Sequence, residues 1–249
     1  MDYPLEDSLE HLTNKTFLDC FKYALRHKSM ECGGYFVIDN YTSKFEFVPL
    51  INDNNYNSDQ FLSKDGRFYK DYVSGSIISL FHSHLIDDPK PSKTDLETSH
   101  SFALPSFIFS VKSKLSFLSY PTNYKPPSLS NRFFVPSFQD CMIYVKDYLQ
   151  LNFDINLNQF KSNWSRRRDN PNYYLFEFLN NYFDEVPSHE FRNGDIFVFD
   201  PSLYSYNHLG IVDQNEYLMH HPVYMLPLKE LITSELLNKV YKVYRYKDS

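Results

Sequence analysis

Two groups of residues in the sequence have the types and spacing that metal or thiol chemistry requires. The first begins with His82 and His84 and, after a short loop, ends in the pattern Ser-x-x-Asp at Ser92 and Asp95. Side chains two residues apart on an extended segment project to the same side, so both imidazoles can face one point. Two imidazole nitrogens and one carboxylate oxygen suit a tetrahedral Zn²⁺ whose fourth position stays open for water. The pattern therefore predicts a catalytic metal site.

The second group lies in the C-terminal half of the chain. Cys141 follows Asp140 at the start of a predicted amphipathic helix, where the helix dipole favours a thiolate. His208 begins one predicted strand and His220 ends another, with His221 beside it. A cysteine that faces a histidine, oriented in turn by a third polar residue, is the arrangement of papain-like nucleophiles. A small buried apolar role for Cys141 is the alternative, and either His220 or His221 fits the third position.

The first group resembles the signature of the JAMM (MPN-type) metalloproteases. That signature includes an upstream glutamate, and Glu31 fits because it precedes a small Cys/Gly cluster and an apolar strand. The resemblance implies that Zn²⁺ is bound by His82, His84 and Asp95. It also implies that Glu31 is the general acid/base on the metal-bound water and that Ser92 steadies the oxyanion.

The second group resembles the NlpC-type cell-wall endopeptidases in its order: Asp-Cys at a helix start, Gly-Asp before a strand, His-x-Gly-Ile, and a further histidine. The resemblance implies that Cys141 is the nucleophile, His208 the base and His220 the orienting residue. Met142 and Ile143 replace the small residues that usually follow the cysteine. They remove no catalytic group, but they reshape the cleft and the oxyanion hole.

A JAMM domain followed by an NlpC-type domain resembles the tail tip assembly proteins of lambda-like tailed phages, over nearly the whole chain. This resemblance implies a two-site hydrolase whose partners are phage tail tip proteins and peptidoglycan stem peptides. It implies the host cytoplasm during assembly as the location, with the virion tail tip as a second one. Two alternatives stay open. One is a non-catalytic tail assembly protein that uses the same domains for binding, and the other is a ubiquitin-type deconjugating enzyme, which fits the zinc half alone.

Composition narrows the classes of function. The 249 residues carry a formal net charge of −6, and the longest basic run is Arg166–Arg168, so nucleic-acid binding has little support. Three cysteines form no disulfide framework and suit a reducing compartment. The first residues lack the pattern of a signal peptide, and no run approaches the roughly 18 apolar residues of a membrane span. We therefore expect neither nucleic acid nor membrane insertion.

The spacing of hydrophobic residues and the positions of proline and glycine predict the helices and strands that position these residues. Three prolines lie within the seven residues 121–127 and indicate a linker. The predicted division is therefore a JAMM/MPN-type zinc metalloprotease domain at 1–120, a linker at 121–132 and an NlpC-type cysteine peptidase domain at 133–249. The fold class is α/β and α+β: a sheet-and-helix metalloprotease domain, then a papain-like α+β domain. The expected helices are 12–26, 60–72, one from Ser92, 139–149 and 171–183, and the expected strands are 35–38, 44–50, 76–81, 105–111, 114–120, 194–200, 207–212, 216–221 and 240–246.

Overall fold

The chain divides into two compact units in the computed structural model. One consists of Met1–Lys125 with Asn158–Ser165, and the other of Pro126–Leu157 with Arg166–Ser249. The break after Lys125 falls inside the predicted linker, but the described residues 159–162 group with the first unit, whereas the sequence prediction gave them to the second domain. The structure describes residues 6–39, 44–52, 65–132, 134–135, 138–157, 159–162, 171–199, 208–222 and 225–247.

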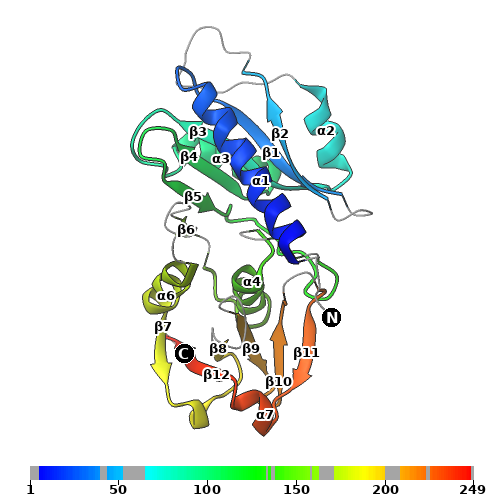
Figure 1. The fold of residues 1–249 in the computed structure, drawn as a ribbon, viewed down its shortest axis with the longest axis vertical. Helices are drawn as coiled ribbons and strands as arrows, with labels where there is room; N and C mark the ends of the chain where they lie inside the picture. The colour runs from blue at the N-terminus through cyan, green and yellow to red at the C-terminus, as the bar shows by residue number, and fades with distance from the viewer. Residues whose placement is uncertain are drawn as a thin grey trace. The chain divides into compact units, whose positions relative to one another are not determined.

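The first unit is built on a mixed sheet. Its elements are α1 (Glu6–Arg26), β1 (Gly33–Ile38), β2 (Phe45–Leu50), α2 (Gly66–Val73), β3 (Ile77–His84), α3 (Lys93–Phe102), β4 (Ser106–Ser110), β5 (Ser116–Ser119) and β6 (Gln159–Ser162). The strand order is β2-β1-β3-β4-β5-β6 (Figure 1). Only β3 and β4 pair in parallel among these strands, and α3 supplies the crossover that a parallel pair needs.

Alternating side chains of β1 divide this sheet into two apolar faces. Phe36 packs against Phe17 of α1 with ring centroids 5.3 Å apart, so α1 covers one face. Tyr35 packs against Phe68 of α2 at 5.4 Å, and Phe102 at the end of α3 packs against the same ring at 4.9 Å. Helices α2 and α3 therefore cover the opposite face.

The histidine pair lies within β3 rather than after it. The sequence prediction ended the strand at Phe81, but the ladder continues because β4 runs alongside as far as the pair His84 and Ser110. Phe81 points toward the face of α1, where its ring packs against Phe36 at 6.3 Å. Alternation along the strand then points His82 and His84 to the other face.

The second unit is built on an antiparallel sheet. Its elements are α4 (Cys141–Phe153), α6 (Pro171–Tyr182), β7 (Phe183–Val186), a 3-10 turn (Ser188–Glu190), β8 (Ile196–Phe199), β9 (Leu209–Asp213), β10 (Tyr217–His220), β11 (Leu228–Leu231), α7 (Ser234–Leu237) and β12 (Val240–Tyr246). The strand order is β11-β10-β9-β8-β12-β7. The sequence did not predict β6, β7, β11 or α7. Both units combine helices with a sheet, so the chain has the mixed α/β composition that the sequence predicted.

A tight turn before β8 anchors the sheet of the second unit. Gly194 has φ +86°, a backbone conformation that glycine adopts without strain. The turn places the Asp195 carboxylate beside Arg245 of β12, whose guanidinium donates hydrogen bonds to it at 2.9 and 2.8 Å. The Gly-Asp pair of the sequence therefore ties β8 to the end of β12, a structural role.

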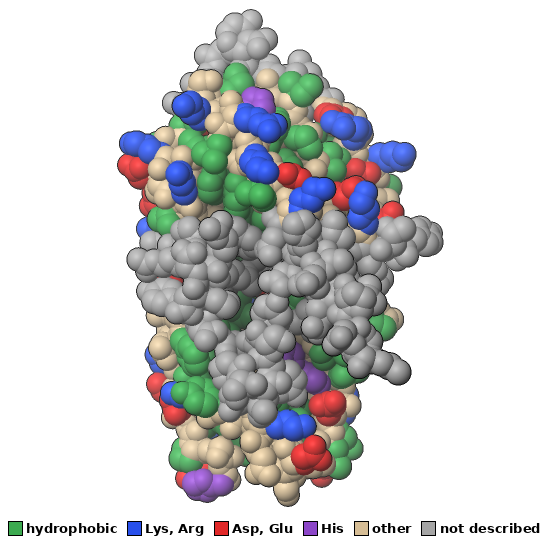
Figure 2. All heavy atoms as spheres, viewed as in Figure 1, with side chains coloured by type: hydrophobic (Ala, Val, Ile, Leu, Met, Phe, Trp, Pro, Cys, Tyr) green, Lys and Arg blue, Asp and Glu red, His purple; other side chains and the backbone are tan. Residues whose placement is uncertain are grey.

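The surface shows mixed charge on the face drawn in Figure 2, where Lys and Arg side chains of the first unit are interspersed with hydrophobic and acidic ones. The basic run Arg166–Arg168 lies outside the described residues. Among the helices of the described part of the chain, none combines the length and the apolar character needed to cross a membrane.

Candidate functional sites

His82, His84 and Asp95 meet on the face of the first sheet that α3 covers. The two imidazole rings of β3 have centroids 5.2 Å apart. Asp95 lies in the first turn of α3, with Oδ1 2.6 Å from His82 Nδ1 and Oδ2 3.1 Å from His84 Nε2. One potential ligand atom from each of the three residues lies within 4.8 Å of the others. The structure thus brings together the three side chains that the sequence predicts as metal ligands.

Ser92 holds the Asp95 carboxylate in this position. As the N-cap of α3, Ser92 Oγ accepts a hydrogen bond from Asp95 N at 3.2 Å and donates one to Asp95 Oδ2 at 2.6 Å. The backbone N–H of Ser92 donates to the same oxygen at 2.7 Å. This capping box fixes the carboxylate at the helix start. A role for Ser92 in steadying an oxyanion stays a prediction, since its hydroxyl here donates to Asp95.

Glu31 lies on the other side of the His82 ring, with Oε2 3.0 Å from His82 Nε2. The segment that carries Glu31 is clamped at two points. Asn52 Nδ2 donates to the carbonyl of Glu31 at 2.8 Å, and the backbone N–H of Cys32 donates to Ser83 Oγ at 2.9 Å. Because Ser83 sits between the two histidines, the clamp sets the distance between the Glu31 segment and β3. The glutamate predicted as acid/base therefore lies beside the cluster of His82, His84 and Asp95.

The electrostatics of this cluster favours a cation. Burial would lower the pKa of His82, but hydrogen bonds with Asp95 and Glu31 outweigh it and raise this pKa to about 9. Burial would raise the pKa of Asp95, yet its contacts with His82 and His84 hold this pKa far below its usual value. At neutral pH the metal-free cluster therefore holds a proton on His82, and a divalent cation that replaced the proton would face the same carboxylate.

The surroundings of His84 fit a metal ligand. Its Nδ1 lies 3.3 Å from the carbonyl oxygen of Asp88, which only accepts hydrogen bonds, so Nδ1 of the neutral ring carries the hydrogen. The Nε2 lone pair then faces an oxygen of Asp95. Two acceptor atoms this close repel each other, and a cation between them would remove the repulsion. Ligand histidines in proteins usually donate their second nitrogen to a carbonyl or carboxylate in this way. Two imidazoles and one carboxylate in this setting fit Zn²⁺.

Helix α4 carries Cys141 at its first position. Asp140 is the N-cap, and its Oδ1 accepts hydrogen bonds from the backbone of Met142 at 3.1 Å and of Ile143 at 3.0 Å. Cys141 is a half-buried thiol outside any disulfide at the positive end of a 13-residue helix, where a thiolate is favoured. Helix α4 packs against β9 and β10, the strands that bear or follow the predicted histidines.

His208 and His220 lie next to each other in the second unit. His208 directly precedes β9, His220 is the last residue of β10, and the two strands pair antiparallel with His220 opposite Gly210. His208 Nε2 lies 2.7 Å from His220 Nδ1, and both side chains are buried. This contact orients the His208 ring through Nε2. The second nitrogen of the ring is Nδ1.

His221, the alternative third member, faces different surroundings. Its Nε2 donates to the carbonyl of Met225 at 3.1 Å. Its ring packs edge-on against Phe134, with centroids 5.3 Å apart, and also contacts Tyr144 of α4 at 5.9 Å. Of the two neighbouring histidines, His220 is therefore the one that contacts His208.

Burial lowers the pKa of all three histidines. The pKa of His208 falls to about 3, chiefly through burial and further through the charges of His220 and His221. The pKa of His221 falls to about 4 through burial and the nearby Arg132. For His220 burial outweighs Glu230, which acts to raise the pKa. All three imidazoles are neutral at neutral pH, the form in which His208 accepts a proton.

We expect acidification to destabilise the second unit. His208 and His221 have folded pKa values of about 3 and 4, below the unfolded value of about 6.5. As pH falls below about 6.5, the unfolded chain binds protons that the folded unit excludes, so the free energy of unfolding falls. At pH 5 the loss is on the order of 2 kcal/mol for each histidine. Hydrogen exchange of second-unit peptides at pH 7 and pH 5 measures it, and His221→Asn should remove about half of the loss. Equal stability at both pH values would contradict the assignment.

The sequence did not predict two features of the second unit. Glu230 of β11 places Oε2 3.3 Å from His220 Nε2. Lys146 and Asp147 of α4 are fully buried together with Arg132, although an amphipathic helix predicts exposed charges. No spacing rule links Glu230 to His220, because strand pairing alone brings them together. The adjacent opposite charges at 146–147 were the one signal that a buried pair was present.

Comparison with known proteins finds a family match in the C-terminal half of the chain. Residues 132–245 match the family model described as NlpC/P60 family. Among solved structures, protein DSY2949 from Desulfitobacterium hafniense is similar, with 22% identity over 43% of this chain and 81% of that chain and a TM-score of 0.32. No curated protein matches the chain. Residues 132–245 thus form an NlpC/P60 domain, and this family points to cell-wall peptidase activity.

Proposed function

We propose that the chain is a two-site hydrolase. The NlpC/P60 domain would use Cys141 to cut the peptide stems of peptidoglycan, and the first unit would use Zn²⁺ to cut a peptide or isopeptide bond. The observation that carries the thiol half is the 2.7 Å contact between His208 and His220 on strands against which the Cys141 helix packs. The family match of residues 132–245 agrees with it.

In the thiol site, His208 Nδ1 takes the proton from Cys141 Sγ while its Nε2 donates to His220. The thiolate attacks the carbonyl carbon of the scissile bond, which gives a tetrahedral intermediate. The leaving amine departs with the proton held by His208, and an acyl-enzyme remains. Water then gives a proton to His208, attacks the thioester carbonyl and releases the acid with free Cys141. The N-terminal dipole of α4 favours the thiolate in both half-reactions.

In the zinc site, His82, His84 and Asp95 would hold the metal, in accordance with the JAMM/MPN resemblance. Zn²⁺ at this position would polarise the substrate carbonyl and acidify a water molecule. Glu31, whose Oε2 lies 3.0 Å from His82 Nε2, would serve as the acid/base that moves a proton to the leaving amine. Ser92 keeps the Asp95 carboxylate turned toward the histidines. The substrate we propose for this site is a protein, such as a tail component.

We further propose that the protein serves phage tail tip assembly. The order of a metal site in the first unit and an NlpC/P60 domain in the second supports this, through the resemblance to the tail tip assembly proteins of lambda-like phages. Its partners would be tail tip proteins and peptidoglycan stem peptides. Its locations would be the host cytoplasm during assembly and the virion tail tip.

Alkylation kinetics tests whether Cys141 is activated. Cys20 and Cys32 are buried, and burial raises the pKa of both thiols, so iodoacetamide should label Cys141 selectively. We expect labelling at pH 6.5 to be about tenfold faster in the wild type than in His208→Ala, since the neutral imidazole accepts the thiol proton. His189→Ala, which removes an exposed histidine, is the control. Equal rates in all three proteins would count against the thiol mechanism.

A further inference from the structure

The contact between His208 and His220 suits the proposed thiol mechanism only when each ring carries its hydrogen on one particular nitrogen. For His208 Nδ1 to accept a thiol proton, the hydrogen of the neutral ring must sit on Nε2, which lies 2.7 Å from His220 Nδ1. That nitrogen of His220 must then accept, so the hydrogen of neutral His220 must sit on Nε2. A neutral imidazole has no built-in preference strong enough to secure this arrangement, and a partner usually sets it.

Glu230 is placed to be that partner. Its Oε2 lies 3.3 Å from His220 Nε2, a buried nitrogen that has no aligned hydrogen-bond partner among the described residues, so the carboxylate is placed to accept its hydrogen after a small side-chain rotation. A carboxylate only accepts hydrogen bonds, so it favours the ring form with hydrogen on Nε2. The separation lies within hydrogen-bond reach, and the 45% exposed side chain of Glu230 has room for this rotation.

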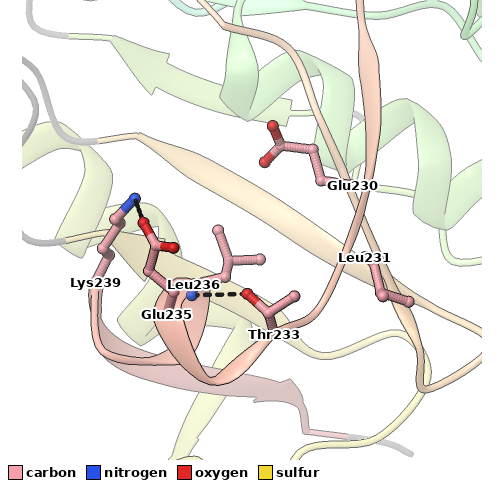
Figure 3. Close-up of a pocket in the computed structure, with 6 residues that line it drawn as sticks. All are labelled: Glu230, Leu231, Thr233, Glu235, Leu236 and Lys239. Atoms are coloured by element: carbon pink, nitrogen blue, oxygen red, sulfur yellow. Dashed lines mark hydrogen bonds and ion pairs between the residues drawn. The ribbon is translucent and has the colours of Figure 1, made fainter.

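The pairing of β10 with β11 brings these two side chains together. Glu230 is opposite Leu218, and His220 is opposite Leu228, so Glu230 and His220 are diagonal neighbours on one face of the pair. Glu230 also lines a groove of about 350 Å³ beside α7. Figure 3 shows its carboxylate lying apart from the ion pair between Glu235 and Lys239 in the same groove. Glu230 is therefore directed to His220 rather than to the lysine.

We propose that Glu230 is a positioning residue that fixes the tautomer of His220 and, through it, the tautomer of His208. This inference rests on the proposed thiol mechanism. Glu230 does not touch the substrate or the thiol. It accepts the hydrogen of His220 Nε2, so that His220 Nδ1 accepts from His208 and His208 Nδ1 stays open for the proton of Cys141.

Three variants separate this role from a structural one. Glu230→Ala removes the acceptor, and we expect kcat on murein stem peptides to fall about tenfold with KM unchanged within about twofold, the scale of losing an outer partner of a functional histidine. Glu230→Gln keeps an acceptor oxygen and should stay within about threefold of the wild type. Glu235→Ala removes a carboxylate from the same groove and should behave as the wild type.

Nitrogen-15 NMR of the histidine rings gives a readout that does not need a substrate. We expect hydrogen on Nε2 of both His208 and His220 in the wild type and in Glu230→Gln. In Glu230→Ala we expect a mixture of tautomers, while Glu235→Ala should match the wild type. Unchanged tautomers in Glu230→Ala would overturn the proposal. Glu230→Gln as impaired as Glu230→Ala would also overturn it, because charge and not hydrogen-bond acceptance would then be responsible.

The two hypotheses can fail separately. If the wild type cleaves no murein peptide, the proposed function fails, and the tautomers of His208 and His220 still decide the role of Glu230. If the wild type cleaves and Glu230→Ala has the same kcat, the proposed function stands and the positioning role is excluded.

Discussion

Replacing Asp147 by alanine is expected to lower the free energy of unfolding of the second unit by about 3–5 kcal/mol, the range for breaking a buried ion pair. Arg132 Nη1 donates to Asp147 Oδ2 at 2.7 Å, and Lys146 Nζ donates to Oδ1 at 3.0 Å. Lys146 and Asp147 are fully buried, and Arg132 is 2% exposed. Without the carboxylate, two cations in the interior would lose the counter-charge that they share.

The two cations would respond differently. Burial lowers the pKa of Lys146, although Asp147 acts to raise it, so without Asp147 this lysine can lose its proton. The guanidinium of Arg132 cannot, because its pKa is too high. Arg132 also donates to the carbonyls of Pro127 at 2.7 Å and Ser128 at 3.0 Å, so the loss should loosen the segment before α4.

Urea unfolding of the full chain, followed by hydrogen exchange of α4 peptides, measures this effect. Asp147→Asn keeps the shape and should destabilise less than alanine, since an amide oxygen still accepts one hydrogen bond. Glu185→Ala is the matched surface control, because Glu185 pairs with Lys242 at 2.7 Å but is 53% exposed, and the loss should stay below about 1 kcal/mol. A similarly small loss for Asp147→Ala would contradict the buried cluster.

Asp95→Ala is expected to weaken Zn²⁺ binding more than about a hundredfold, beyond the 10–100-fold that an outer partner contributes. The carboxylate contacts both His82 Nδ1 and His84 Nε2, so its loss removes one ligand and the charge that the other two share. Ser92→Ala leaves the carboxylate in place but removes the hydrogen bond that Ser92 Oγ donates to Asp95 Oδ2 and the one that it accepts from Asp95 N, and it should weaken binding about tenfold.

Calorimetric titration with Zn²⁺ and metal analysis of the purified proteins provide the readout. Asp87→Ala is the control, because Asp87 is exposed and pairs with Lys112. Equal Zn²⁺ affinity in the wild type and Asp95→Ala would rule out the proposed metal site. Because His82 has a pKa of about 9 in the metal-free protein, Zn²⁺ binding should also release a proton at pH 7.

The approach of His82, His84 and Asp95 to one another could be predicted from the sequence because their geometry follows from local rules. Strand alternation places His82 and His84 on one face, and the capping box turns Asp95 toward that face. Both rules operate within a few residues. The helix expected at 60–72 corresponds to α2, which begins at Gly66 behind the N-cap Asp65, because a glycine near a helix start is tolerated.

Features that depend on pairing between distant segments could not be predicted. β6 joins the first sheet through β5, although the sequence prediction assigned its residues to the second domain. The contact of Glu230 with His220 follows from the pairing of β10 and β11. The choice between His220 and His221 required the position of His208, since adjacent strand residues look alike until the neighbouring strand is placed.

The most direct test of the account is mass spectrometry of purified muropeptides after incubation with the wild type, Cys141→Ala and His84→Ala, each with its zinc content determined. We expect that the wild type and His84→Ala cut the stem peptides, that Cys141→Ala does not, and that only His84→Ala lacks zinc. Cleavage that survives in Cys141→Ala but disappears in His84→Ala would contradict the assignment of murein hydrolysis to the NlpC/P60 domain.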